Sequence, residues 1–143
     1  MNALDKRILS ALAQDARIGV SALARGFGLA RSTIQARIER LEARGIITGY
    51  TVKLGDAVRL GRIRASVLLQ VEPRTTAAVV ARLKSIHEVE IIHTCSGRFD
   101  MILDLAAETT TRMDEVLDEI GSIRGVRSSE SLIHLSTKFD RSL

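Results

Sequence analysis

Apolar residues in the first third of the chain recur at helical spacing, in three short segments separated by glycine. In the first segment, Leu4, Ile8 and Leu12 lie on one face of a helix. The second segment ends at Gly28 and the third at Gly45, and glycine readily adopts the left-handed conformation that ends a helix. The pattern therefore predicts three helices, over residues 3–14, 20–26 and 31–43.

A glycine-bounded segment follows the third helix. Residues 46–54, with Gly49 inside them, indicate a small β-hairpin, or wing. Short helices joined by a glycine turn and followed by a hairpin are typical of a winged helix-turn-helix domain. We therefore predict such a domain over residues 1–54 and a linker over residues 55–61 (GDAVRLG).

From Arg62 onward the hydrophobic period changes to two, which indicates a β-strand that Pro73 closes. Thr111 and Asp114 form the pattern of a capping box at the start of a later helix. The order of the expected elements, β-α-β-β-α-β, predicts an α+β fold with both helices on one face of a sheet. The elements are strands over residues 62–72, 89–96, 100–107 and 126–137, and helices over residues 75–86 and 111–120.

The other face of this sheet is expected to be partly apolar. By alternation it carries four aliphatic side chains beside three polar ones. Four aliphatic residues on an uncovered sheet face indicate a stacked partner, so we predict a dimer formed through this face. The seven residues are Leu68, Ile92, Ile102 and Leu132, with Gln70, Asp104 and His134.

Positive charge is concentrated in the N-terminal part of the chain. Residues 1–61 contain ten Lys and Arg against five Asp and Glu, a net charge of +5. Residues 62–143 contain eleven against twelve, a net charge of −1, so the two parts together give the +4 of the whole chain. This asymmetry suggests that the first part meets nucleic acid and the second part meets something else.

A row of arginines occupies the third predicted helix, on a different face from its apolar stripe of Ile34, Ile38 and Leu41. Such a row also occurs on solvated helix faces, and Glu39 and Glu42 offer local ion pairs. The preceding helix, the glycine turn and the net basic charge favour double-stranded DNA as its partner. In such a motif the helix start reaches base edges and later residues take phosphates. The expected base-edge residues are Arg31, Ser32, Thr33 and Gln35, and the expected phosphate ligands are Arg37, Arg40, Arg44 and Lys53.

The segment Ser96-Gly97-Arg98-Phe99-Asp100 joins two predicted strands. One reading is an ordinary hairpin turn in which Asp100 caps the loop amides. The other is a binding site, in which open amides near Gly97 hold a carboxylate while Asp100 accepts an ammonium group. Ser129 and Ser131 share one face of the last strand and could contribute hydroxyl groups.

Other reactive residues have simpler interpretations. Cys95 in a strand fits a small buried hydrophobic residue, and His87, His93 and His134 lack the spacing of metal ligands. No recognisable catalytic or nucleotide-binding motif is present, so no metal, cofactor or enzymatic activity is predicted. Charges at residues 5–7 interrupt any signal peptide, and no apolar run is long enough to span a membrane, which predicts a cytoplasmic protein.

An ordered set of short motifs lies along the chain: Leu4-Asp5 and Ile8-Leu9, then Ile34, Arg37-Ile38 and Leu41-Glu42, then Gly45-Ile46-Ile47-Thr48-Gly49-Tyr50, then Gly97-x-Phe99-Asp100. With this set the chain resembles the Lrp/AsnC family, the leucine-responsive and asparagine-responsive (feast/famine) transcription regulators. The resemblance implies an N-terminal DNA-binding domain and a C-terminal ferredoxin-like domain, residues 62–143, for effector binding and assembly. It further implies dimers that associate into tetramers, octamers or larger rings, with a small effector, usually an amino acid, bound where dimers meet.

The resemblance also implies roles for individual residues. Gly97, Phe99 and Asp100 match the effector loop of the family, and Ser129 and Ser131 fall where the family often has threonines. These positions, with Arg98, form the expected effector site.

Two positions depart from the family pattern. Ala30 stands where the family commonly has a serine that caps the recognition helix, so Ser32 is expected to cap it instead. Arg98 adds a cation to the effector loop, which would select an acidic or uncharged effector or leave the site empty.

The leading hypothesis is a sequence-specific transcription regulator that responds to a small effector. An alternative is a tetrapyrrole (siroheme-type) decarboxylase, since an offshoot resembling this family has the same two domains, but that activity calls for pocket histidines and the three here are scattered. An RNA-binding module with the same sheet topology would stack bases on sheet aromatics, and the expected strands offer almost none.

Overall fold

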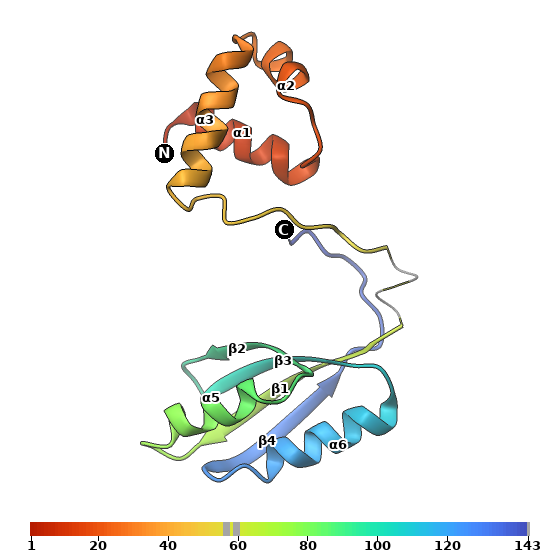
Figure 1. Ribbon diagram of the computed structural model, residues 1–143. Helices are drawn as coiled ribbons and strands as arrows, with labels where there is room; N and C mark the ends of the chain where they lie inside the picture. The colour runs from red at the N-terminus through yellow and green to blue at the C-terminus, as the bar shows by residue number, and fades with distance from the viewer. Residues whose placement is uncertain (56–57, 59–60, 143) are drawn as a thin grey trace. The chain divides into compact units, whose positions relative to one another are not determined.

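The computed structural model of this chain describes residues 1–55, 58 and 61–142 (Figure 1). It contains two compact units, residues 1–53 and residues 54–140. Most of the predicted linker, residues 55–61, lies outside the described residues.

Three helices form the N-terminal unit: α1 (Ala3–Gln14), α2 (Val20–Phe27) and α3 (Arg31–Ala43). The three predicted helices are confirmed, and α2 is one residue longer than expected. Asn2 begins α1 with a complete capping box, in which its side chain accepts a hydrogen bond from the Asp5 amide at 2.9 Å. Gly28 ends α2 in the left-handed conformation, with φ of 65°, as its position in the sequence predicts.

A small aliphatic core holds these helices together. α1 contributes the fully buried Ile8, and its Leu4 and Leu12 pack against the same cluster from the rim. Complete burial of one such side chain contributes about 2 kcal/mol to folding. The apolar stripes predicted for the first and third helices are therefore confirmed. The remaining core residues come from α2 and α3: Leu23, Ala24, Ile34, Ile38 and Leu41.

The predicted wing is wrong as a hairpin, because residues 46–55 contain no strand. A two-stranded hairpin is only marginally stable unless one of its faces is buried. The side chains of Tyr50, Val52 and Leu54 are all more than half exposed, so they provide no such face. A glycine-bounded segment after a helix is therefore not enough to predict a hairpin.

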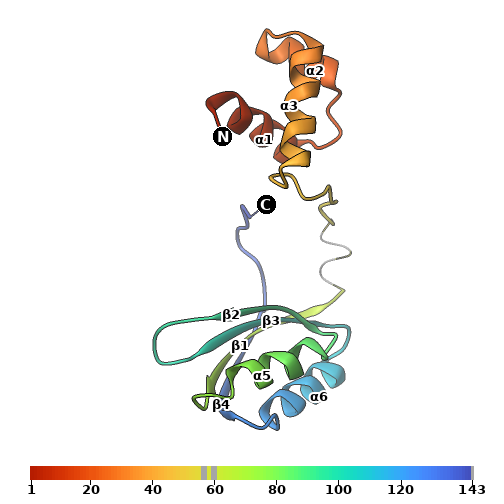
Figure 2. The same cartoon turned by 60° about the vertical axis from the view of Figure 1, so that its left-hand side comes forward.

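The C-terminal unit is a four-stranded antiparallel sheet in the order β2-β3-β1-β4. Both helices cover one face of the sheet (Figures 1 and 2). The predicted order β-α-β-β-α-β and the α+β fold class are confirmed. The elements are β1 (Ile63–Val71), α5 (Thr76–Lys84), β2 (Val89–Thr94), β3 (Met101–Ala107), α6 (Thr110–Gly121) and β4 (Val126–Ile133).

Most boundaries agree with the sequence prediction to within two residues, and two differences stand out. The capping box of Thr111 and Asp114 is wrong, because Thr109 is the N-cap of α6 and its hydroxyl accepts a hydrogen bond from the Arg112 amide at 3.0 Å. Of three consecutive threonines, the one with extended backbone takes the cap. The last strand also ends at Ile133, four residues earlier than expected.

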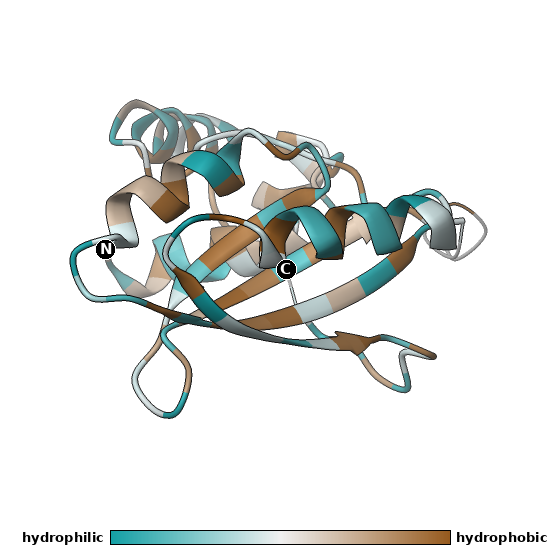
Figure 3. Cartoon of the chain, turned by 90° about the horizontal axis from the view of Figure 1, so that it is seen from below, coloured by the Kyte–Doolittle hydropathy of each residue, from teal (hydrophilic) through white to brown (hydrophobic). Residues whose placement is uncertain are grey.

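The core of this unit lies between the sheet and the two helices. Along β1, Ala65, Val67, Leu69 and Val71 are buried in strict alternation. They pack with the inward residues of β3 and with both helices, so the hydrophobic side of the strands faces the helices. Figure 3 colours the hydrophobic and polar residues that follow one another along the strands. The core is almost wholly aliphatic, as the low aromatic content of the chain predicts.

The opposite, open face of the sheet differs from the prediction at one residue. Ile92 pairs with Leu103 and packs on the helix side, so its predicted place on the open face is wrong. Ile91 pairs with Asp104 and takes that place, partly exposed. The cause is a shift in the β2–β3 register between Val89 and Ile91, since one extra residue reverses the facing of every residue beyond it.

Candidate nucleic-acid interface and effector site

Helix α3 has two chemically different faces. Ile34, Ile38 and Leu41 are buried in the core of the N-terminal unit. Arg40 and the C-cap residue Arg44 are exposed. The helix is thus anchored on one side and cationic on the other, which is the arrangement needed to dock against phosphates.

The start of α3 carries the four expected base-edge residues, and all of them are exposed: Arg31, Ser32, Thr33 and Gln35. The Gln35 amide already donates a hydrogen bond to Glu39 at 2.8 Å, which holds its side chain along the helix. Ala30 is the N-cap, and no side chain caps α3, so the expected cap by Ser32 is wrong. Ser32 lies inside the first turn, where its hydroxyl remains available to a partner. An uncapped helix start leaves backbone amides and a positive dipole end that favour an anion.

Arg37 differs from the other arginines of α3. Its Nη1 lies 3.3 Å from Oδ1 of Asp5 on α1, and the two side chains are 28% and 6% exposed. The structure therefore brings this expected phosphate ligand to a buried carboxylate rather than leaving it free in solvent.

Lys53, the last expected phosphate ligand, is exposed in the segment that lacks the predicted hairpin. No strand pairing holds this residue at a set distance from α3.

The expected effector loop is tied to the central strand β1. The Asp100 amide donates to the Leu69 carbonyl at 2.8 Å, and the Asp100 carboxylate accepts the Val71 amide at 2.7 Å. The Cys95 thiol lies 3.1 Å from the Phe99 carbonyl oxygen, to which it donates. One oxygen of Asp100 thus binds an amide of β1 rather than the loop amides that the hairpin interpretation expected, and the other oxygen could accept an ammonium group.

Arg98 lies largely exposed at the tip of this loop. Its guanidinium is 5.2 Å from the centre of the Phe99 ring and 3.8 Å from the Glu130 carboxylate. Its carbonyl accepts a hydrogen bond from Gln70 at 2.8 Å, and Gln70 in turn accepts one from the Ser128 hydroxyl at 2.6 Å. The loop is therefore supported by polar residues of the open sheet face.

Ser129 and Ser131 lie on the other side of the sheet. They pair with Leu69 and Val67, whose side chains are buried under the helices. The structure therefore separates these serines from the open-face residues that support the loop. Gln70, Ser128 and Glu130 were missed as loop partners, although alternation with Leu132 in the last strand could have placed Ser128 and Glu130 on that face.

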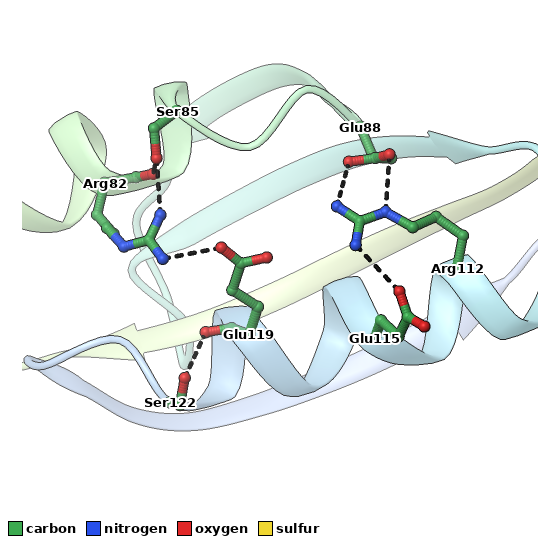
Figure 4. Close-up of polar contacts among 7 residues, drawn as sticks. All are labelled: Arg82, Ser85, Glu88, Arg112, Glu115, Glu119 and Ser122. Atoms are coloured by element: carbon green, nitrogen blue, oxygen red, sulfur yellow. Dashed lines mark hydrogen bonds and ion pairs between the residues drawn. The ribbon is translucent and has the colours of Figure 1, made fainter.

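Ion pairs join the two helices and the neighbouring loop of the C-terminal unit (Figure 4). Arg112 on α6 makes two hydrogen bonds of 3.0 Å to Glu88 and one of 3.1 Å to Glu115. Arg82 on α5 donates to Glu119 on α6 at 2.8 Å. The hydrogen bonds from Arg112 hold the pKa of the Glu88 carboxyl below its ordinary value.

A cavity of about 390 Å³ lies beside this network, and Arg112, Glu88 and His87 are among its lining residues. Because Arg112 is already satisfied by Glu88 and Glu115, the cavity offers an anion no free guanidinium from that residue. The arrangement fits a structural brace better than a binding site.

The histidines occupy separate positions. His134 Nε2 is 2.9 Å from the Ser66 hydroxyl, His93 pairs with Ile102 on the open face, and His87 lines the cavity. Within the described part of the chain, no group of three side chains could hold a metal ion. None of the described helices has the length and apolar character required to cross a membrane.

Comparison with known proteins agrees with this architecture. Residues 1–42 match the AsnC-type helix-turn-helix domain, and residues 64–143 match the Lrp/AsnC ligand binding domain. The chain belongs to the Lrp/AsnC family. It is a transcriptional regulator with a DNA-binding helix-turn-helix domain and a ligand-binding domain.

Three similar proteins illustrate the match. An uncharacterised HTH-type transcriptional regulator of Pyrococcus furiosus is 30% identical, over 96% of this chain and 94% of its own length. The structure of AsnC from E. coli matches with a TM-score of 0.89 and 25% identity, over 100% of this chain and 97% of that one. A transcriptional regulator of Neisseria meningitidis, solved as a complex with L-Met, has the same fold, with a TM-score of 0.85 and 24% identity over 98% and 93% of the two chains.

Proposed function

We propose that this regulator binds specific DNA sequences through α3 and responds to a small effector, an amino acid or related metabolite, through its C-terminal domain. The observation that carries the DNA part is the division of α3 into a buried aliphatic face and an exposed cationic face. The relatives are named as transcriptional regulators, which agrees with a role in binding rather than catalysis.

In this proposal the exposed residues at the start of α3 reach base edges, and the arginines near its end take phosphates. Arg31, Ser32, Thr33 and Gln35 supply the sequence preference. Arg40, Arg44 and Lys53 supply affinity and register, since phosphate contacts carry no sequence information. A twofold dimer would read two half-sites about one helical turn of DNA apart.

DNA binding is tested with a duplex selected by the full-length chain from a random-sequence library, beside a scrambled duplex of the same length and composition. Fluorescence anisotropy over a series of salt concentrations gives both affinities and the salt slope. A specific regulator prefers the selected duplex by about a thousandfold or more. Equal affinity for both duplexes would reduce the function to non-specific binding.

The effector part of the proposal rests on the loop of residues 97–100. The Neisseria relative carries L-Met, and the loop here presents Gly97, Arg98, Phe99 and the second oxygen of Asp100. Arg98 adds a cation, which favours an acidic or uncharged effector over a basic one. Ser129 and Ser131 could join this site only from the helix side of β4.

Thermal-shift screening against amino acids and related metabolites tests the effector. A ligand that binds only the native state raises the denaturation midpoint in a concentration-dependent way. The absence of any shift, with DNA affinity unchanged across the panel, would remove the effector from the proposal.

We further propose that the open sheet face forms a dimer and that dimers associate into larger assemblies such as octamers. Leu68, Ile102 and Leu132, with Ile91, form an aliphatic group on this face. An effector that contacts two chains binds only the assembled state and so shifts the equilibrium toward it. Sedimentation with and without the effector should show this shift, and a monomer under all conditions would contradict it.

A further inference from the structure

Asp5 is the one buried polar or charged residue found in the part of the chain that the structure describes, and it is 4% exposed. It lies in the first turn of α1, 32 residues before Arg37 of α3. Burying a carboxylate is costly unless it is paired and hydrogen-bonded, and an apolar pair of similar volume often stabilises a protein as well or better. Its presence therefore calls for an explanation beyond stability.

Two contacts satisfy this carboxylate, one within α1 and one from α3. Oδ2 accepts the Asn2 backbone amide at 3.3 Å, which completes the capping box and holds the Asp5 side chain against the start of α1. Oδ1 accepts a hydrogen bond from Nη1 of Arg37, also at 3.3 Å. The start of α1 is thereby joined to the middle of α3.

The hydrogen bond between Asp5 and Arg37 restricts rotations of α3 that the apolar core alone would permit. Hydrophobic contacts are non-directional, so the stripe of Ile34, Ile38 and Leu41 stays buried through small rotations of α3. A hydrogen bond between a guanidinium and a carboxylate depends on distance and angle. Any rotation of α3 also moves the side chains at its start, which reach the base edges in the proposed function.

We propose that Asp5 positions the recognition helix through Arg37, and that Arg37 is a positioning residue rather than a phosphate ligand. The proposal rests on the proposed DNA binding and replaces the phosphate role that the arginine spacing suggested for Arg37. Arg37 thus has a different role from Arg40 on the next turn. Arg40 is exposed and makes no ion pair within the described residues. The buried carboxylate offsets the charge of Arg37, so little remains for a phosphate.

The test compares Asp5→Asn, Arg37→Gln and the matched control Arg40→Gln in the full-length chain, with the selected and scrambled duplexes. The control should lower the salt slope by about one without changing the preference between duplexes. Arg37→Gln should leave the salt slope unchanged. Both Asp5→Asn and Arg37→Gln should reduce the preference about tenfold, the size expected for one lost base contact. Circular dichroism at the assay temperature confirms that each variant is folded.

A double variant, Asp5→Asn with Arg37→Gln, guards against loss of folding in the single variants. It leaves no unpaired buried charge, so it should recover the denaturation midpoint that each single change lowers. Its preference between duplexes should stay reduced, because the directional pair is still missing. A purely structural role predicts that the preference recovers together with the midpoint, and this result would overturn the proposal.

Two further outcomes count against the proposal. A salt slope that falls for Arg37→Gln as it does for Arg40→Gln, with the preference kept, would return Arg37 to the phosphate ligands. A wild-type chain that does not distinguish the two duplexes would overturn the proposed function and this inference together. That failure is recognisable because it occurs before any variant is tested.

Discussion

The arginines of the two units lie in opposite electrostatic surroundings. In the C-terminal unit, Arg82 and Arg112 bind Glu119 and Glu88 and join the helices to one another and to the adjacent loop (Figure 4). In the N-terminal unit, the arginines that follow the first turn of α3 project into solvent, apart from Arg37. The same side chain serves as a brace where a carboxylate lies within reach and as a candidate DNA contact where none does.

The difference follows from the distribution of acidic residues. Residues 62–143 carry slightly more acidic than basic residues, and Arg64, Arg82, Arg98 and Arg112 each lie within reach of a glutamate. Residues 1–61 carry twice as many basic residues as acidic ones, so most of their positive charge stays unbalanced. A row of arginines therefore indicates a binding surface only when the surrounding carboxylates are too few to neutralise it.

The largest expected effect is the loss of stability when a core residue of either unit is truncated. Ile34→Ala should lower the free energy of unfolding of the N-terminal unit by about 3 kcal/mol, because it removes a fully buried side chain and leaves a cavity. Leu103→Ala is the matched change in the C-terminal unit. Urea denaturation followed by circular dichroism should show that each variant shifts a different transition. One common transition in both variants would mean that the units unfold together.

A large effect is also expected on DNA affinity. Replacing Arg40 and Arg44 together with glutamine should lower the salt slope of DNA binding by about two, since each phosphate contact releases about one counterion. Arg82→Gln should leave the slope unchanged, because Glu119 already neutralises that guanidinium. Anisotropy titrations at several salt concentrations measure both. Equal salt slopes for the two variants would contradict the distinction between arginines held in ion pairs and arginines that contact DNA.

A moderate effect is expected at the effector loop. Gly97 has φ of 143°, which a side chain disfavours, so Gly97→Ala should cost about 1 kcal/mol of stability. The control is Gly49→Ala in the N-terminal unit, where an added Cβ meets nothing within 4 Å and φ is ordinary. Its cost should stay below about 0.5 kcal/mol by urea denaturation. A larger cost at Gly49 than at Gly97 would contradict the backbone argument.

The smallest expected effect is on the stability of the protein at acid pH. Arg112 lowers the pKa of the Glu88 carboxyl below its ordinary value of 4.5. The ion pair therefore contributes its full stability above pH 4.5, and the contribution is lost as the pH falls through the lowered pKa of the folded state. Denaturation midpoints measured from pH 6 to pH 3 should fall less steeply for Glu88→Gln than for the wild-type chain. The difference should be small, because the Arg112 side chain is 40% exposed and solvent screens the pair.

Much of the architecture was predictable from local patterns. The stripes of Ile8, Ile34 and Ile38 and the alternation along β1 depend only on the period of the elements, so helices, strands and their order followed from them. Gly28 and Asn2 end and begin helices through contacts within a few residues. The exposed face of α3 follows from the same periodicity once its buried face is known.

Errors arose where a distant part of the chain decides the outcome. The β2 register shift, which no local pattern reveals, exchanged Ile91 and Ile92 between the two faces of the sheet. The segment at residues 46–54 was expected to form a hairpin, but Ile47 packs against the core of the N-terminal unit while Tyr50, Val52 and Leu54 stay more than half exposed. The cap of α6 is a local exception: Thr109 and not Thr111 has the extended backbone of an N-cap, and the sequence pattern did not distinguish the two.

By itself, the sequence determined the kind and order of the elements, the basic character of the first unit and the family to which the chain belongs. Only the tertiary structure decided which arginine is available to a ligand. Arg37 and Arg40 have the same chemistry and nearly the same helical context, yet a carboxylate 32 residues away pairs with one of them. Ion pairs depend on distance in space, and the sequence expresses distance only along the chain.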